Sequence, residues 1–267
     1  MVRRRSRTPS EAVVYGSHAV SQFVESSPER VIRLLMTERA SSGRLQPLAQ
    51  RVAAAGIPLA VAPREELEAC AGGGVHQGVV AIVHPRPSGD ENDLEQLLGS
   101  LEESPFLLVL DGIQDPHNLG ACLRTADATG VHAVVAPRNR AVGLTPAVRK
   151  VATGAAETVP FIQVTNLART LRFLAVHGIR CIGADGEADA SLFDADLSGP
   201  LALVMGAEGR GLRRLTREHC DLLVSLPQVG TLKSLNVSVA AGTCLYFALS
   251  QRAPYASPRV ATPRQVE

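Results

Sequence analysis

Short apolar runs alternate with helical segments along most of the chain after residue 93, and this alternation constrains the fold more than any other feature. Helices are predicted at 119–129, 146–156, 167–177, 212–220 and 235–251. Strands are predicted at 106–110, 131–136, 159–164, 181–184, 201–205 and 222–226. Such alternation predicts an α/β fold, in which helices cover both faces of a mostly parallel sheet. Ligand sites in such sheets lie just beyond the carboxyl ends of the strands.

A smaller α/β unit is predicted to precede this region. Within residues 11–85, helices are expected at 17–25, 45–55 and 64–71, and strands at 31–36, 57–62 and 79–83. The segment PRPSGD that follows is rich in proline, serine and glycine, which is typical of an interdomain linker. We therefore predict domains at 11–85 and 93–252, a linker at 86–92, a basic disordered tail at 1–10 and a C-terminal tail at 253–267.

Composition narrows the range of functions. With 267 residues, of which 45% are hydrophobic and 20% charged, the chain is globular and long enough for two cores. It has no apolar run near the ~20 residues that span a bilayer, and no apolar segment after its charged N-terminus. Its five cysteines are widely spaced without a CxxC pair, so we expect no disulfide framework and no metal. These features predict a cytoplasmic protein without a membrane anchor.

Net charge gives little guidance, because the formal charge is only +1. Residues 1–10, however, carry four arginines and no acid. A basic tail of this kind can contact the phosphates of a nucleic acid. A disordered, solubilising tail has the same composition, so this segment leaves both interpretations open.

The first polar loop follows the predicted strand at 106–110 and contains Asn118 and, six residues later, Arg124. Asparagine offers a donor and an acceptor, and arginine offers a rigid fork of donors. Together they can hold a phosphate or an alkoxide. Taken alone, the loop is explained better by Asn118 as a helix cap and Arg124 as a surface charge.

The second polar loop follows the strand at 201–205 and places Gly206, Gly209 and Gly211 within six residues. Glycines permit positive φ and close approach of the backbone to a ligand. Their spacing is neither the GxGxxG of dinucleotide sites nor a Walker loop, which ends in Gly-Lys-Ser/Thr. A glycine loop without lysine suits a ligand that has no phosphate chain. A plain tight turn is the alternative.

The third polar loop follows the strand at 222–226 and places Ser234 and Asn236 immediately before a helix of small residues. Either residue could simply cap that helix by accepting a hydrogen bond from a free backbone N–H. Each loop thus has a structural explanation of its own, and the combination of the three carries the functional signal.

In combination, the three loops resemble the ordered motifs of the SpoU (TrmH) family of RNA ribose methyltransferases. The matching segments are NLG with Arg124, MGAEGRG at 205–211, and SLNVSVA at 234–240. Segments YGSHAV at 15–20 and VHQGVV at 75–80 resemble the family's substrate-binding domain, and the resemblance covers residues 11–252. Gln228 and Lys233 depart from it, since a methionine and a small residue are expected there.

The resemblance implies a fold, a cofactor and a set of site residues. The N-terminal domain is expected to be L30e-like and the C-terminal domain to be a trefoil-knotted methyltransferase domain. S-adenosylmethionine is the implied cofactor, held by Gly206, Leu226 and Leu235, with Val204, Ala207 and Gly211 beside them. Arg124 is expected to fix a phosphate and stabilise a developing alkoxide, because arginine stays protonated. The residues expected to orient the ribose and Arg124 are Asn118, Glu208, Ser234 and Asn236.

The implied function is 2′-O-methylation of a ribose in ribosomal RNA. Among family members, the match is greatest to those that modify a guanosine in the peptidyl-transferase region of 23S rRNA. The implied partners are 23S rRNA or a ribosome assembly intermediate, and a second copy of the chain. A homodimer could use small and apolar residues of the last helix, namely Val237, Val239, Ala240, Ala241, Leu245 and Ala248. These residues would equally suit an ordinary core helix.

Three other functions remain open. A tRNA 2′-O-methyltransferase of the same family would carry the same motifs. A dinucleotide-dependent oxidoreductase requires GxGxxG after its first strand, and the turn at 111–120 lacks that spacing. A non-catalytic RNA-binding protein would suit the N-terminal unit, but it has no use for the glycine loop and the Ser-Leu-Asn loop together.

Overall fold

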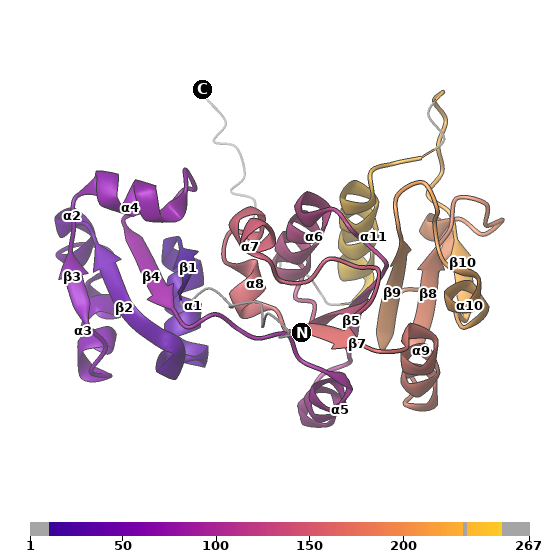
Figure 1. The fold of residues 1–267 in the computed structure, drawn as a ribbon, viewed down its shortest axis with the longest axis horizontal. Helices are drawn as coiled ribbons and strands as arrows, with labels where there is room; N and C mark the ends of the chain where they lie inside the picture. The colour runs from indigo at the N-terminus through magenta and orange to yellow at the C-terminus, as the bar shows by residue number, and fades with distance from the viewer. Residues whose placement is uncertain (1–10, 232–233, 253–267) are drawn as a thin grey trace, which may run out of the picture.

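The chain folds into two units, each built on its own sheet and joined by one extended stretch (Figure 1). The computed structural model describes residues 11–231 and 234–252. The expected tails at 1–10 and 253–267, together with Lys233, lie outside the described residues.

The N-terminal unit contains a four-stranded mixed sheet in the order β1-β4-β2-β3. Strand β4 runs antiparallel to β1 and β2, whereas β2 and β3 are parallel. The elements are β1 (Ala12–Tyr15), α1 (Ser17–Ser26), β2 (Val31–Met36), α2 (Glu38–Ser41), α3 (Gln46–Ala54), β3 (Leu59–Val61), α4 (Arg64–Ala71) and β4 (Val79–Val83). Phe23 of α1 and Leu48 of α3 pack on one face of the sheet, and Leu67 of α4 packs on the other.

The C-terminal unit contains a six-stranded parallel sheet in the order β10-β8-β9-β5-β6-β7, which confirms the predicted α/β class. The elements are α5 (Glu91–Ser100), β5 (Phe106–Asp111), α6 (Pro116–Ala128), β6 (Ala133–Pro137), α7 (Pro146–Ala152), α8 (Ala155–Thr158), β7 (Phe161–Val164), α9 (Leu167–Val176), β8 (Arg180–Ala184), β9 (Leu201–Gly206), α10 (Arg214–Glu218), β10 (Leu222–Val224) and α11 (Val237–Arg252).

Alternating side chains of the central strands build two apolar layers, as a strand buried on both faces requires. Leu108 and Leu110 of β5 face a layer that includes α6, α7, α8 and α11. Leu107 and Val109 of the same strand face α5 and α9. Helix α11 packs against α6 and β9, so the last helix lies beside the centre of the sheet. The carboxyl ends of β5 and β9 therefore open next to the start of α11.

The structure corrects the sequence predictions at several elements, among them helix α2, which was not predicted. The single helix predicted at 146–156 was wrong: it breaks into α7 and α8 because Thr153 and Gly154 take positive φ values of 53° and 101°. Strand β1, which pairs with β4 at the sheet edge, was not predicted. Helix α5 was not predicted either, although Asp90 and Asp93 form a capping box at its start.

Glu157 of α8 joins the two units. Its side chain is 2% exposed and accepts hydrogen bonds from Arg30 of the N-terminal unit at 2.8 Å and from the backbone of Arg86 at 2.6 Å. Arg149 of α7 pairs with the same carboxylate. Residue Gly89 adds backbone hydrogen bonds to both sides of Ile162. The stretch predicted as a linker at 86–92 is thus held against the C-terminal unit, and its last two residues lie in α5. The domain boundaries themselves stay a prediction.

Candidate active site

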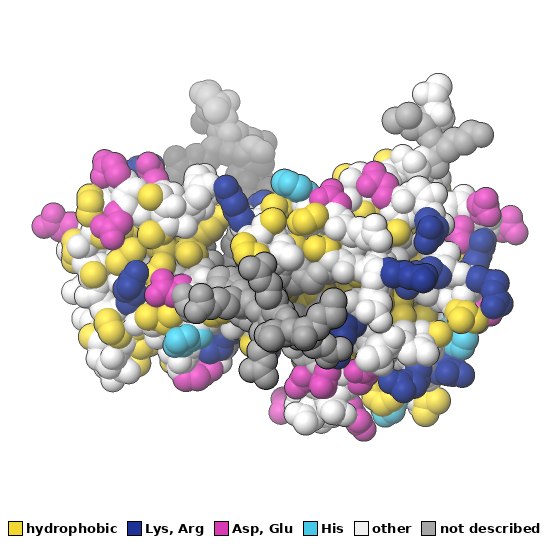
Figure 2. Space-filling model, viewed as in Figure 1, with side chains coloured by type: hydrophobic (Ala, Val, Ile, Leu, Met, Phe, Trp, Pro, Cys, Tyr) yellow, Lys and Arg dark blue, Asp and Glu magenta, His cyan; other side chains and the backbone are white. Residues whose placement is uncertain are grey.

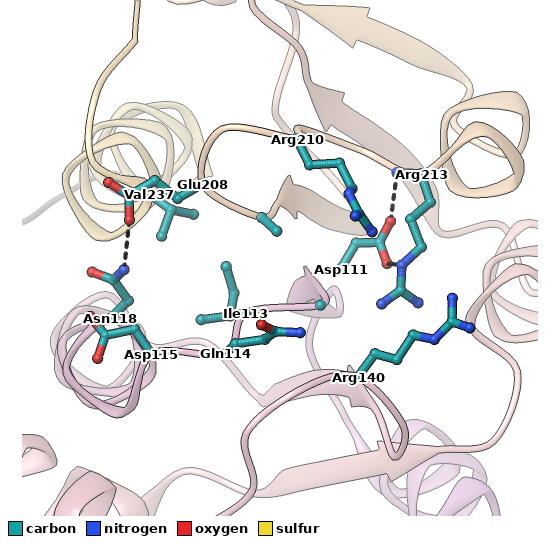
Figure 3. A pocket seen from close by; sticks show the side chains of 12 residues that line it. Asp111, Ile113, Gln114, Asp115, Asn118, Arg140, Glu208, Arg210, Arg213 and Val237 are labelled. Carbon is teal, nitrogen blue, oxygen red and sulfur yellow. Dashed lines mark hydrogen bonds and ion pairs between the residues drawn. The ribbon is translucent and has the colours of Figure 1, made fainter.

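Three polar residues from distant parts of the chain form one hydrogen-bonded series. Asn236, just before α11, donates through Nδ2 to Oδ1 of Asn118 at 2.9 Å. Asn118, in the first turn of α6, donates through Nδ2 to Oε2 of Glu208 at 3.2 Å (Figure 3). Asn118 is 6% exposed, so its amide needs both partners. The first, second and third polar loops therefore meet at one point.

Asn118 is not needed to cap helix α6, so its side chain is free to bind Glu208 and Asn236. Helix α6 is capped by Asp115, whose carboxylate accepts the backbone N–H of His117 at 2.9 Å, and Pro116 takes the first helical position. The alternative reading of Asn118 as the cap was therefore wrong. Asn236 does act at the start of α11: its Oδ1 accepts the backbone N–H of Ser238 at 2.9 Å while its Nδ2 binds Asn118.

The glycine loop after β9 closes tightly on itself. Ala207 and Gly211 exchange two backbone hydrogen bonds, at 3.2 and 2.8 Å. A Cβ at Gly206 would lie 2.1 Å from the backbone carbon of Gly211 and 2.4 Å from the nitrogen of Leu212. Because no real Cβ approaches backbone so closely, only glycine fits at 206. The loop consequently presents backbone to the space beside it.

That space is an open cleft of about 320 Å³ between the glycine loop and the start of α11. Five of the six residues predicted to hold the cofactor line it, namely Gly206, Ala207, Gly211, Leu226 and Leu235. Glu208, Ser234 and Gln228 also line it. Val204 does not, because its side chain is fully buried in the apolar layer of α5 and α9.

Arg124 lies outside the hydrogen-bonded series. Six residues along a helix place it about 120° around the axis from Asn118 and about 9 Å along it. Its side chain is exposed and forms no hydrogen bond or ion pair with any residue in 11–231 or 234–252. A single chain thus brings together Asn118, Glu208 and Asn236, but not Arg124.

A second cleft, of about 330 Å³, lies on the other side of Glu208 and was not predicted (Figure 3). Arg140, Arg210 and Arg213 line it together with the buried Asp111. Asp111 could have been recognised from the sequence, because it directly follows an apolar strand. Arg140 could not, since the loop after β6 reaches the cleft only through the fold.

Within the part of the chain that the structure describes, we examined possible metal ligands and reactive cysteines. There, no group of three or more His, Cys, Asp or Glu side chains is placed to hold a metal ion. Burial raises the pKa of Cys122 and Cys244 to about 12, which keeps both thiols protonated at neutral pH. Among the described helices, none has the length and apolarity to cross a membrane.

Two family descriptions match this chain. Residues 105–246 match the SpoU rRNA Methylase family, and residues 13–88 match a domain described as RNA 2′-O ribose methyltransferase substrate binding. The chain is 54% identical over 240 residues to the 23S rRNA (guanosine-2′-O-)-methyltransferase RlmB of Yersinia pestis, covering 90% of this chain and 97% of that one. The RlmB of Escherichia coli strain K12 is 51% identical over 240 residues, covering 90% and 98%.

A solved structure agrees with these matches. The SpoU methyltransferase AviRb from Streptomyces viridochromogenes, in complex with AdoMet, superposes with a TM-score of 0.66 at 26% identity and covers 91% of this chain and 90% of that one. Sequence, fold and the three motifs that meet in space all agree. The chain belongs to the SpoU rRNA methylase family.

Proposed function

We propose that the chain transfers a methyl group from S-adenosylmethionine to a guanosine 2′-oxygen of 23S rRNA. The observation that carries this proposal is the series Asn236–Asn118–Glu208, which borders the glycine-loop cleft. Relatives at about half identity over nearly their whole length are named for this reaction. A guanosine in the peptidyl-transferase region is the finer target that we propose.

The cleft beside the glycine loop fits the cofactor. Its volume lies within the range of small-molecule sites, about 300–1,000 Å³. Its walls are backbone at Gly206 and Gly211 and apolar side chains at Leu226 and Leu235, which suit an adenosine without a phosphate chain. Ala207 lines the same wall. When bound there, S-adenosylmethionine supplies an activated methyl group.

The side chains of the series would orient the ribose. Glu208 uses one carboxylate oxygen for Asn118, and its other oxygen forms no hydrogen bond with any described residue. That oxygen can accept a hydrogen bond from a ribose hydroxyl. Ser234, exposed on the cleft wall, can donate a further one. Alignment of the attacking oxygen supplies much of the rate in such reactions.

Arg124 would stabilise negative charge during the reaction. A ribose hydroxyl must lose its proton during attack, and arginine, which stays protonated, is not the base. We assign it to the neighbouring phosphate and to the developing alkoxide. Because Arg124 points away from the series in one chain, we propose that a second copy of the chain brings the remaining groups to it.

Of the six residues first expected at the dimer interface, Val239 alone belongs to the exposed stripe of α11 that we propose for it. Val237, Ala241, Leu245 and Ala248 pack in the chain's own core. The outer stripe of α11 instead exposes Val239 (54%) and Tyr246 (55%), on either side of Thr243. Light scattering should show a dimer at micromolar concentration, and Tyr246→Asp should shift it toward monomer. A wild-type monomer would refute the dimer.

The N-terminal unit is proposed to recognise the RNA. It carries a groove of about 1,290 Å³ lined by Arg39, Arg44 and Arg64 and by the loop at 73–78. We propose an L30e-like domain at 11–85 and a trefoil-knotted domain at 93–252, because residues 13–88 and 105–246 match the two domains described for this family. We further propose that the protein acts in the cytoplasm, on 23S rRNA or an assembling particle.

Methyl transfer from labelled S-adenosylmethionine tests the function. The purified chain should label unmodified 23S rRNA and leave tRNA unlabelled, and digestion should release 2′-O-methylguanosine. Labelling of tRNA alone would favour the tRNA-modifying alternative. RNA binding without any transfer would favour a non-catalytic protein. A Glu208→Gln variant, which keeps the hydrogen bond to Asn118 and loses the charge, gives a matched control for the site.

A further inference from the structure

Three arginines from two loops converge on the cleft beside Glu208. Arg140 comes from the loop after β6, Arg210 from the glycine loop, and Arg213 from the turn before α10. Their guanidinium groups lie on one side of the hollow, and Asn118 and Glu208 lie on the other (Figure 3). We call the whole hollow the arginine cleft, after Arg140, Arg210 and Arg213.

The buried carboxylate of Asp111 fixes the position of Arg213. The carboxylate of Asp111, which is fully buried, accepts the backbone N–H of Arg213 at 2.9 Å and lies 3.4 Å from its Nε. Gly112, with φ of 85°, gives the guanidinium room, since a Cβ there would lie 2.6 Å from Nη2 of Arg213. The position of this cation is therefore built into the end of β5.

The other two cations have no counter-charge. Neither Arg140 nor Arg210 forms a hydrogen bond or ion pair with any residue that the structure describes, and both are exposed. The three arginines and the buried carboxylate of Asp111 thus lie on one side of the hollow, and the carboxylates of Asp115 and Glu208 line the opposite side. The like charges gathered on the arginine side repel one another, and an anion that binds beside them relieves this repulsion. Figure 2 shows dark-blue side chains, the colour of Lys and Arg, on the same lobe over β8, β9 and α10.

We propose that the arginine cleft binds a phosphodiester of the RNA strand next to the methylated nucleotide. Guanidinium forks match phosphate oxygens in geometry and charge. The cleft shares Asn118 and Glu208 with the reacting centre, so a strand whose ribose lies at that pair passes directly into it. Phosphate contacts of this kind fix the register of the strand and leave the base to be read elsewhere. This inference rests on the proposed function.

Charge-removing substitutions with matched neighbours test it. Arg140→Gln, Arg210→Gln and the double variant remove the two unpaired cations. Arg138→Gln and Arg214→Gln are controls: Arg138 lies two residues from Arg140 outside the cleft, and Arg214 pairs with Glu218 at 2.6 Å on α10. The measurements are affinity for unmodified 23S rRNA at several salt concentrations and, separately, affinity for S-adenosylmethionine.

The double variant should bind RNA at least about tenfold more weakly, as the loss of charge-assisted hydrogen bonds predicts. The slope of log affinity against log salt should fall by about one. Arg140→Gln should keep the wild-type cofactor affinity. RNA binding equal to the controls overturns the proposal, as does a loss confined to S-adenosylmethionine, which would assign the cleft to the cofactor carboxylate. A wild type that binds RNA without methylating it refutes the proposed function. The comparison of variants then still shows whether the arginine cleft binds RNA. A wild type that does not bind RNA overturns both.

Discussion

Replacing Glu157 by glutamine should destabilise the protein more than any surface charge change. The carboxylate is 2% exposed, and its partners Arg149 and Arg30 are 10% and 18% exposed, so water screens the ion pairs only weakly. The NH2 group of the new amide would face either the donor of Arg149 or the donors of Arg30 and the Arg86 backbone. Burial and the nearby Arg30 already lower the pKa of Arg86, which shows how much positive charge is gathered here.

The expected loss follows from the burial. Removing one partner of a buried ion pair costs about 3–5 kcal/mol, because the remaining charges stay buried and uncompensated. For a chain of this size, that corresponds to a fall in melting temperature of about 10 °C. Urea denaturation and calorimetry of the full-length chain give both quantities.

Glu68→Gln is the matched control. Glu68 pairs with Arg64 at 2.8 Å within one helix, and both side chains are exposed, so its loss should leave the unfolding free energy nearly unchanged. A double-mutant cycle between Arg30→Met and Glu157→Gln then isolates the coupling between the two units. If Glu157→Gln stays within 1 kcal/mol of wild type, the ion pairs do not hold the units together as argued.

Three further outcomes are expected. Arg124→Ala should lower the rate of methyl transfer about a hundred- to a thousandfold, the usual cost of losing one transition-state donor, at an unchanged melting temperature; near-normal turnover would exclude Arg124 from the site. Gly206→Ala should displace the loop and weaken S-adenosylmethionine binding in calorimetry far more than Gly230→Ala, where a Cβ meets nothing within 4 Å and φ is not positive; equal losses would contradict this. Hydrogen bonds from Thr165 lower the pKa of Glu91 to about 2, so the carboxylate's stabilising contribution is complete above about pH 4.5 and is lost as the pH falls toward 2. The difference in unfolding free energy between wild type and Glu91→Gln should shrink over that range, and a constant difference would refute the assignment.

The sheet of the C-terminal unit could be predicted because its strands are short apolar runs separated by helical segments. Strand β1 escaped because four residues, Ala12–Tyr15, are too few to show a period, and its place at the sheet edge depends on pairing with β4. The break between α7 and α8 escaped because Thr153 is β-branched, and such residues rarely take the left-handed conformation.

The polar loops of the site could be predicted from the sequence, but the contacts between their side chains could not. Resemblance to the family singled out Asn118, Glu208 and Asn236, but each loop alone favoured a simple cap or turn. Only the fold shows that Asp115 caps α6 and frees Asn118. The arginine cleft and the pairing of Arg30 with Glu157 join residues far apart in sequence, so no local sequence pattern predicts them.

Mapping of ribose methylation in rRNA tests the central claim most directly. Ribosomal RNA would be compared between a strain that carries the gene for this chain, the same strain lacking it, and the deleted strain complemented with wild type or Asn118→Ala. The account predicts that one 2′-O-methylguanosine of 23S rRNA is lost on deletion, restored by the wild type and not restored by the variant. An unchanged methylation pattern of 23S rRNA in the deleted strain would contradict it.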